Sequence, residues 1–168
     1  MARFKWTLAA MFLFLGQVAL AADDIEDDDT LTATQKEQLK KVQENLSLVT
    51  KDSKKTKDEK DAALADALRA VLVQNSQPSD MSIDKLAGNL AGNIGQGNID
   101  VRDSVLLTKT LMKFLNNGDF SIDSNRNLVK NVEGIVQTSG LSSDDRNQLY
   151  NAILTVVSTA DGYKRNGK

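Results

Sequence analysis

Residues 99–115 read IDVRDSVLLTKTLMKFL, and this stretch contains the pattern that decides the fold. Ile99 is followed at once by a helix-capping residue, Asp100, and further apolar residues come eight, twelve, fifteen and sixteen positions after Ile99. Those four offsets lie on one face of a helix with 3.6 residues per turn. An aspartate oxygen can also accept hydrogen bonds from the free N–H groups of the first turn. The stretch therefore predicts one capped helix with an apolar stripe.

The same pattern begins again at Phe120 and at Leu141, where Ser121 and Ser142 occupy the capping position. Repetition at a fixed spacing indicates one structural unit used several times. The stripes of the three units predict these core residues: Leu107, Leu111, Phe114 and Leu115; Leu128, Val132, Ile135 and Val136; and Leu149, Ile153, Val156 and Val157.

Three earlier segments are less regular copies of the unit, and they begin at Leu31, Thr56 and Met81. Gln43 and Ser47 interrupt the apolar stripe of the first copy. The caps expected for these copies are Thr32, Asp58 and Ser82. Together the six units predict helices at residues 32–50, 58–75, 82–94, 100–116, 121–138 and 142–160.

These six helices define an all-α fold class, because apolar and polar residues never alternate over a sustained stretch as they do in strands. A compact six-helix bundle is the favoured architecture, since helices and links of ordinary length explain units of ~21 residues. The alternative is a short helical-repeat domain resembling an α-solenoid. Two such units span about 42 residues, a length typical of HEAT and armadillo repeats.

Residues 1–21 have the composition of a signal peptide. Arg3 and Lys5 form a short basic region, residues 7–15 are almost wholly apolar, and Ala19 and Ala21 provide the small residues of a cleavage site. The apolar run is too short to span a bilayer, and no second run of about twenty apolar residues follows. We therefore expect an exported protein, periplasmic or extracellular, that is not transmembrane after signal cleavage.

The remaining chain divides into one domain with two tails. Six of the eight residues 22–29 are acidic, so mutual repulsion predicts an extended, disordered acidic tail over residues 22–30. Residues 31–161 contain all six units and form a single all-helical domain. The last residues, 162–168, include Lys164, Arg165 and Lys168 and are expected to form a frayed basic tail.

The composition excludes several kinds of chemistry. The 168 residues include no Cys and no His, so the chain has no thiol nucleophile, no disulfide and no zinc site of the usual ligands. A Ser-His-Asp triad is also excluded. The formal net charge of −2 argues against nucleic-acid binding, which needs a dense basic surface. We expect no cofactor, no metal and no catalysis.

Residues 86–97, LAGNLAGNIGQG, are the first candidate for an interaction site, and Gly88 and Gly92 stand four residues apart within them. Glycine costs about 1 kcal/mol relative to alanine inside a helix, so this helix should be the weakest of the six. Glycines kept in a helix predict a close backbone contact. That contact is either internal packing or a face for a partner or a second copy.

A lysine-rich link, residues 51–60, is the second candidate, and we single out Lys54, Lys55 and Lys57. These lysines could contact an anionic surface, but interleaved acidic residues dilute their field and no aromatic residue lies among them. A solvated connection between helices is the simpler interpretation.

These observations favour an exported, non-catalytic helical protein that acts through protein–protein contact, with an unidentified partner or with itself. An envelope or peripheral membrane protein that uses the lysine-rich link and the glycine-rich helix is the alternative. A small carboxylate-dependent hydrolase is the third reading, although the carboxylates lie mainly at helix caps, in the acidic tail and among lysines.

Overall fold

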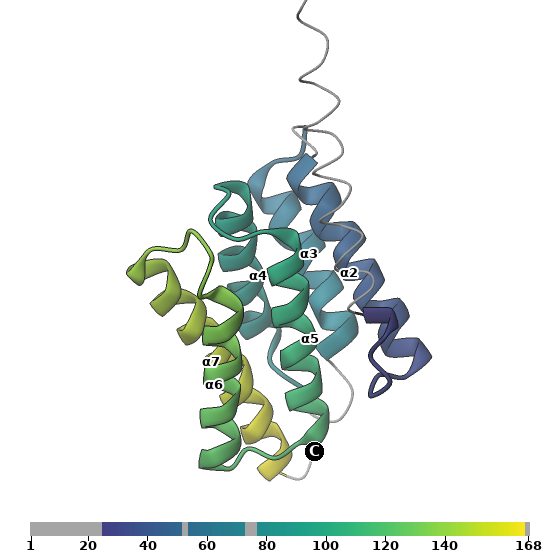
Figure 1. Cartoon of the computed structure of the whole chain (residues 1–168), viewed down its shortest axis with the longest axis vertical. Coiled ribbons are helices and arrows are strands. Elements are labelled where there is room, and N and C mark those ends of the chain that lie inside the picture. The colour runs from purple at the N-terminus through teal and green to yellow at the C-terminus, as the bar shows by residue number, and fades with distance from the viewer. Residues whose placement is uncertain (1–24, 52–53, 73–76, 167–168) are drawn as a thin grey trace, which may run out of the picture.

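The computed structural model describes residues 25–51, 54–72 and 77–166, and the side chains of residues 48–51 are not described. Across these ranges the chain forms helices and no strand, so the predicted all-α class is confirmed (Figure 1). The helices, labelled α2 to α7, are Ala33–Lys51, Lys57–Leu72, Asp80–Gly95, Val101–Asn117, Ile122–Val136 and Ser143–Arg165. Residues 73–75, which the sequence assigns to the second helix, lie outside the described residues.

The capping residues of the three regular units are confirmed. The side chains of Asp100, Ser121 and Ser142 each accept a hydrogen bond from a backbone N–H three residues on, at the start of α5, α6 and α7. The α5 helix ends at Asn117 and is capped by Gly118, whose φ of 64° lies in the left-handed region that glycine adopts without strain. This residue turns the chain tightly into α6.

Two of the caps predicted for the irregular units are wrong. Ser79, not Ser82, caps α4; Ser82 lies buried in the first turn, where its hydroxyl donates to the Ser79 carbonyl. At α3 the helix begins at Lys57, and Thr56 exchanges hydrogen bonds with Glu59 across the first turn, so that Asp58 is not needed as a cap. In both cases the residue directly before the helix, Ser79 or Thr56, provides the hydroxyl that accepts a hydrogen bond from an N–H group of the first turn.

The apolar stripes converge on one core. Of the twelve residues predicted from the regular units, ten are buried, while Phe114 and Ile135 are partly buried and pack against the core. Gln43 does not interrupt the stripe as expected, because its side chain is only 5% exposed and occupies the core position. Three stripe residues that share one offset are among the buried ones: Leu111, Val132 and Ile153.

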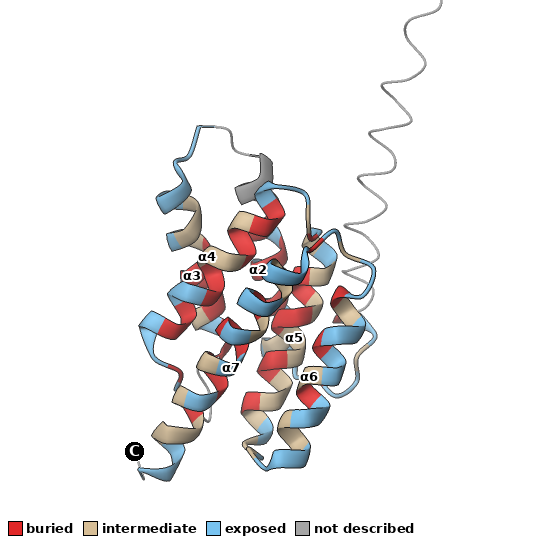
Figure 2. Cartoon of the chain, turned by 90° about the vertical axis from the view of Figure 1, so that its left-hand side faces the viewer, coloured by how far each residue is buried: buried red, intermediate tan, exposed pale blue. Residues whose placement is uncertain are grey.

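The helices pack as a compact bundle rather than as an open solenoid. In a solenoid each helix pair contacts only its neighbours along the chain. Here α7 returns to pack against α4, and α2 packs against α5. The α6 helix differs from the rest, because it packs chiefly against α5 and leaves much of its surface exposed at the edge of the bundle (Figure 2).

The described part of the acidic segment is folded, so the prediction of a disordered tail over residues 22–30 is wrong for residues 25–30. Ile25 is 0% exposed and belongs to the hydrophobic core, and Leu31 is also buried. The carboxylates find cationic partners: Glu26 pairs with Lys40 of α2, and Asp28 pairs with lysines of α5. Those partners compensate the repulsion among the acidic side chains that the sequence suggested.

The predicted basic tail is also wrong as far as the structure describes it, because α7 continues to Arg165. Arg165 pairs with Asp161 one turn earlier, and Lys164 donates to the Gly118 carbonyl and lies 5.7 Å from the centre of the Phe120 ring. The contacts of Lys164 hold the last turn of α7 against the turn between α5 and α6.

Candidate functional site

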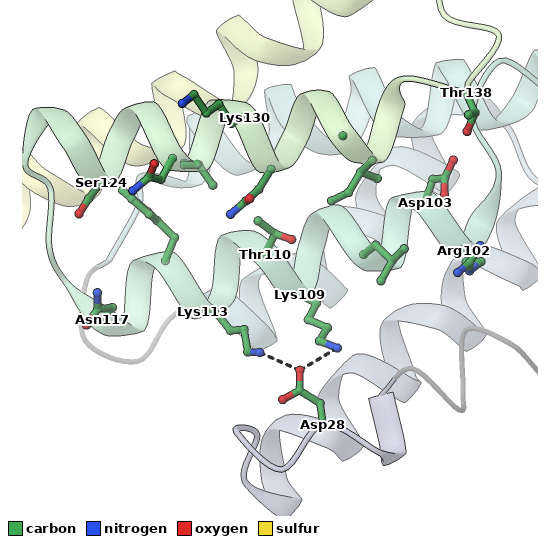
Figure 3. A pocket seen from close by; sticks show the side chains of 17 residues that line it. Asp28, Arg102, Asp103, Lys109, Thr110, Lys113, Asn117, Ser124, Lys130 and Thr138 are labelled. Carbon is green, nitrogen blue, oxygen red and sulfur yellow. Dashed lines mark hydrogen bonds and ion pairs between the residues drawn. The ribbon is translucent and has the colours of Figure 1, made fainter.

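A groove of about 910 Å³ runs along the outer side of α5. The helix α6 lies on one flank of α5, and the folded acidic segment, residues 25–31, lies on the other (Figure 3). Asn117 and Ser124 mark one end of the groove, and Asp103 and Thr138 mark the other. The groove therefore follows a helix for most of its length, which suits an extended ligand better than a compact one.

The groove exists because α5 is amphipathic. Its apolar stripe, with Leu107 and Leu111, faces the core and is buried. Between the stripe positions the sequence places Lys109, Thr110 and Lys113, which line the groove. The tight turn at Gly118 then brings α6 back alongside α5.

Asp28 lies at the centre of the polar contacts in this groove. Its Oδ2 accepts from Lys109 Nζ at 2.8 Å and from Lys113 Nζ at 2.7 Å (Figure 3). Its Oδ1 accepts from the backbone N–H of Thr30 at 3.0 Å and from the Thr30 hydroxyl. Hydrogen bonds from Lys109, Lys113 and Thr30 hold the pKa of Asp28 well below its ordinary value, so the carboxylate is ionised at neutral pH.

The two lysines that contact Asp28 differ in how far their side chains are exposed. The side chains of Asp28 and Lys109 are each 14% exposed, whereas that of Lys113 is 40% exposed. A half-buried ion pair of this kind is costly to break from one side, because the remaining charge is left without its partner. Lys109 therefore has mainly a structural part in holding the segment, and Lys113 offers donors toward the groove.

The lining as a whole is basic and amphipathic. Its charged residues are Arg102, Lys109, Lys113 and Lys130 against Asp28 and Asp103, an excess of two positive charges on a chain whose formal charge is −2. Burial raises the pKa of Asp103, which lies at one end of the groove. The uncharged lining includes both amide and apolar side chains: Asn127, Asn131, Leu106, Phe114 and Ile135.

The glycine prediction fails in its internal form. A Cβ added at Gly92 meets no atom within 4 Å, and one added at Gly88 meets only the Asp61 carboxylate, at 3.5 Å. No neighbouring backbone approaches either residue within that range, so these glycines do not serve close packing between helices. Their part in an interaction with another molecule stays a prediction.

The structure does bring the two predicted interaction sites to one end of the bundle. Lys54, Lys55 and Lys57 are all exposed at the start of α3. Because α3 and α4 are connected in sequence and pack closely, with Asp61 beside Gly88, the start of α3 lies near the end of α4 that carries Gly92. Neither group lines the groove along α5.

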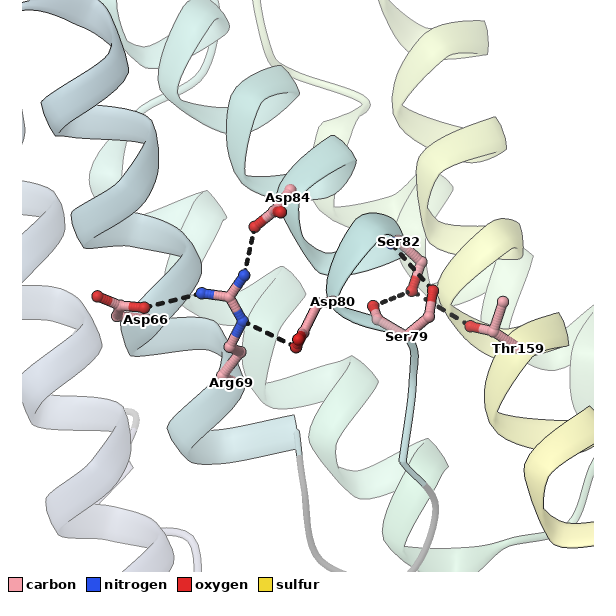
Figure 4. Close-up of polar contacts among 7 residues, drawn as sticks. All are labelled: Asp66, Arg69, Ser79, Asp80, Ser82, Asp84 and Thr159. Carbon is pink, nitrogen blue, oxygen red and sulfur yellow. Dashed lines mark hydrogen bonds and ion pairs between the residues drawn. The ribbon is translucent and has the colours of Figure 1, made fainter.

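A second polar cluster joins α3 to the start of α4. The Arg69 guanidinium contacts three carboxylates, at 2.8 Å from Asp66, 3.1 Å from Asp80 and 2.5 Å from Asp84 (Figure 4). All three acids are exposed, so each pair contributes little on its own. The cluster connects α3 to the first turns of α4 through Asp80 and Asp84.

The sequence shows only part of the groove. Lys109 and Lys113 stand four residues apart, which puts them on one helix face. Their partner Asp28 lies 85 residues from Lys113 in the chain, and no local pattern connects them. The segment's anchor, Ile25, stands between Asp24 and Glu26 in the sequence, and one apolar residue among carboxylates does not by itself predict a folded segment.

Among the described helices, none combines the length and the apolar character needed to cross a membrane. In the same part of the chain, no three acidic, histidine or cysteine side chains come together as metal ligands. Comparisons with protein-family models, with curated proteins and with solved structures find no match for this chain.

Proposed function

We propose that this protein is exported and acts, without catalysis, by contact with another protein. The observation that supports the proposal is the long, open groove along α5, which has a volume of about 910 Å³ and is lined by lysine, amide and apolar side chains. Such a mixture suits a polypeptide, because amides pair with its backbone while apolar side chains pack against its side chains. The signal-like residues 1–21 support the exported location.

The groove supports binding better than hydrolysis. A carboxylate-dependent hydrolase needs two acidic groups that face the same scissile bond, with different tasks as acid and base or nucleophile. In this groove both oxygens of Asp28 already accept hydrogen bonds from Lys109, Lys113 and Thr30. A carboxylate held in this way by two cations is a poor proton donor and a poor base.

The alternative, contact with an envelope or membrane surface, is supported by one observation. The exposed lysines 54, 55 and 57 and the glycine-rich end of α4 lie at the same end of the bundle, so a single anionic surface could meet both. Interleaved acids lower the attraction of this face. Salt-sensitive binding to anionic vesicles, lost in a Lys54, Lys55 and Lys57 to Gln variant, would favour the alternative.

A photo-cross-linking residue at Asn131, an exposed position in the groove, tests the proposal in the native compartment. The matched control places the same residue at Ala62, an exposed position on α3 outside the groove. We expect one discrete protein adduct from position 131 and none from position 62. Equal labelling at both positions, or no adduct at position 131, would count against a partner in the groove.

Export is tested separately on the full-length protein made in its own cell. N-terminal sequencing of the material from the extracytoplasmic fraction should begin at Ala22. Protein that stays in the cytoplasm with residues 1–21 attached would contradict the location, whatever the cross-linking shows.

A further inference from the structure

The folded acidic segment shows what kind of group the groove accepts. Asp28 is a carboxylate from outside α5, and it reaches two lysines of that helix at 2.7 and 2.8 Å. Its side chain lies on the flank of α5 opposite α6, where it forms part of the groove lining (Figure 3). The chain therefore already contains one acidic residue bound to this surface, with all the geometry of a charge-assisted hydrogen bond.

We propose that the groove along α5 binds an acidic segment of a partner protein, and that Asp28 occupies the first carboxylate position of that site. This inference rests on the proposed function, because it names the chemistry of the partner that the groove takes. We infer an acidic partner segment because the groove lining has an excess of positive side chains, although the chain as a whole has a net negative charge.

The remaining lining extends the same chemistry beyond Asp28. Lys113 is 40% exposed and keeps room for a second acceptor, and Lys130 lines the groove from α6. Asn127 and Asn131 line the groove from α6 together with Lys130, and their amides can meet a peptide backbone. A segment with several spaced carboxylates would thus meet lysines of both α5 and α6.

This arrangement makes Asp28 a competitor of the partner. A tethered carboxylate has a high effective concentration at the lysines, so it occupies them for most of the time. The apparent affinity for an outside ligand is then its intrinsic affinity multiplied by the fraction of time for which the site is free. Removal of the Asp28 charge should therefore strengthen binding of an acidic peptide rather than weaken it. A merely structural ion pair predicts the opposite, because its loss would loosen the surface on which the peptide binds.

The test measures the binding of a fluorescent hexa-aspartate peptide to the full chain by anisotropy. We expect Asp28→Asn to raise the affinity about tenfold, as for a site that is free roughly one-tenth of the time in the wild type. Lys113→Gln and Lys130→Gln should each lower it several-fold, and added salt should weaken it in every variant. Lys41→Gln removes an equal charge from an exposed position on α2, outside the groove, and should leave the affinity unchanged.

Several results would overturn the proposal. These are an unchanged or lower affinity in Asp28→Asn, or a loss in Lys41→Gln equal to that in Lys113→Gln. If inorganic phosphate or phosphatidylglycerol vesicles gain as much as the peptide from Asp28→Asn, the groove is a general anion site and the claim of an acidic peptide fails. Dimers of the wild type that Lys113→Gln abolishes, seen by sedimentation, would identify a second copy as the occupant instead.

Circular dichroism melts of each variant show whether it is folded. If Asp28→Asn does not fold, the comparison of Lys113→Gln and Lys130→Gln with Lys41→Gln decides the question alone. Cross-linking at position 131 tests whether any protein lies in the groove, whereas the binding of the hexa-aspartate peptide to the variants tests whether the groove prefers an acidic segment. A cross-linked partner with no peptide binding would therefore refute only the acidic chemistry.

Discussion

Substitution of Gly92 by Ala should stabilise the protein, although the sequence pattern predicted a close contact at this position. The residue lies in the last full turn of α4, and a Cβ built there meets no atom within 4 Å. No steric cost therefore offsets the usual gain from replacing glycine in a helix, which is about 1 kcal/mol. For a domain of this size that gain corresponds to a rise in melting temperature of about 4 °C.

Gly88→Ala is the matched comparison, because it makes the same change one turn earlier in the same helix. Its Cβ would lie 3.5 Å from the Asp61 carboxylate, whose Oδ1 is already buried without a hydrogen-bond partner. The added methyl group takes further water from that carboxylate, so we expect a smaller gain than at Gly92. Urea unfolding of the two variants and the wild type measures the free energies. A loss of stability in Gly92→Ala would refute this reasoning and would favour the close backbone contact that the sequence predicted at Gly92.

Three further predictions concern the core, the acidic segment and one carboxylate. Leu111→Ala, at a buried stripe position, should lower the free energy of unfolding by roughly 2–5 kcal/mol in a urea titration. Ile25→Ala should release the segment that Ile25 anchors, seen as faster hydrogen exchange over residues 25–31 with unchanged exchange in α4. Burial raises the pKa of Asp61, so its ionisation opposes folding; Asp61→Asn should exceed the wild type in stability at pH 7, with the difference vanishing below about pH 4 in melts across pH.

The sequence predicts the helices and the core well because both depend on local patterns. An apolar stripe with a period of 3.6 residues identifies the buried face of each helix whatever it packs against. Caps such as Asp100 and Ser121 act on N–H groups only two or three residues away. The caps of α3 and α4 were missed because two candidate residues stand close together there, and the pattern does not say which one reaches the free N–H groups first.

The arrangement of the helices and the groove depends on contacts between distant segments, and these leave no local signal. A run of carboxylates predicts repulsion unless the cationic partners of Glu26 and Asp28 on α2 and α5 are known. Likewise, nothing in the stripe of α7 says that it packs against α4 and that α6 stays at the edge. The prediction of close internal packing at the glycines of α4 was wrong for a different reason, because low helix propensity alone does not distinguish close packing from open space.

Each end of the described chain is fastened to at least one helix that is distant from it in sequence, and this affects how the protein folds. The first segment is held by α2 and α5, and the last helix is held by α4 and α5. Contacts of large sequence separation form late, because the loop between them must be closed first. A nascent chain that still lacks α7 leaves the apolar face of α4 uncovered, so the bundle is complete only when its final helix has been synthesised. Truncation at the C-terminus should therefore cause aggregation rather than a smaller stable domain.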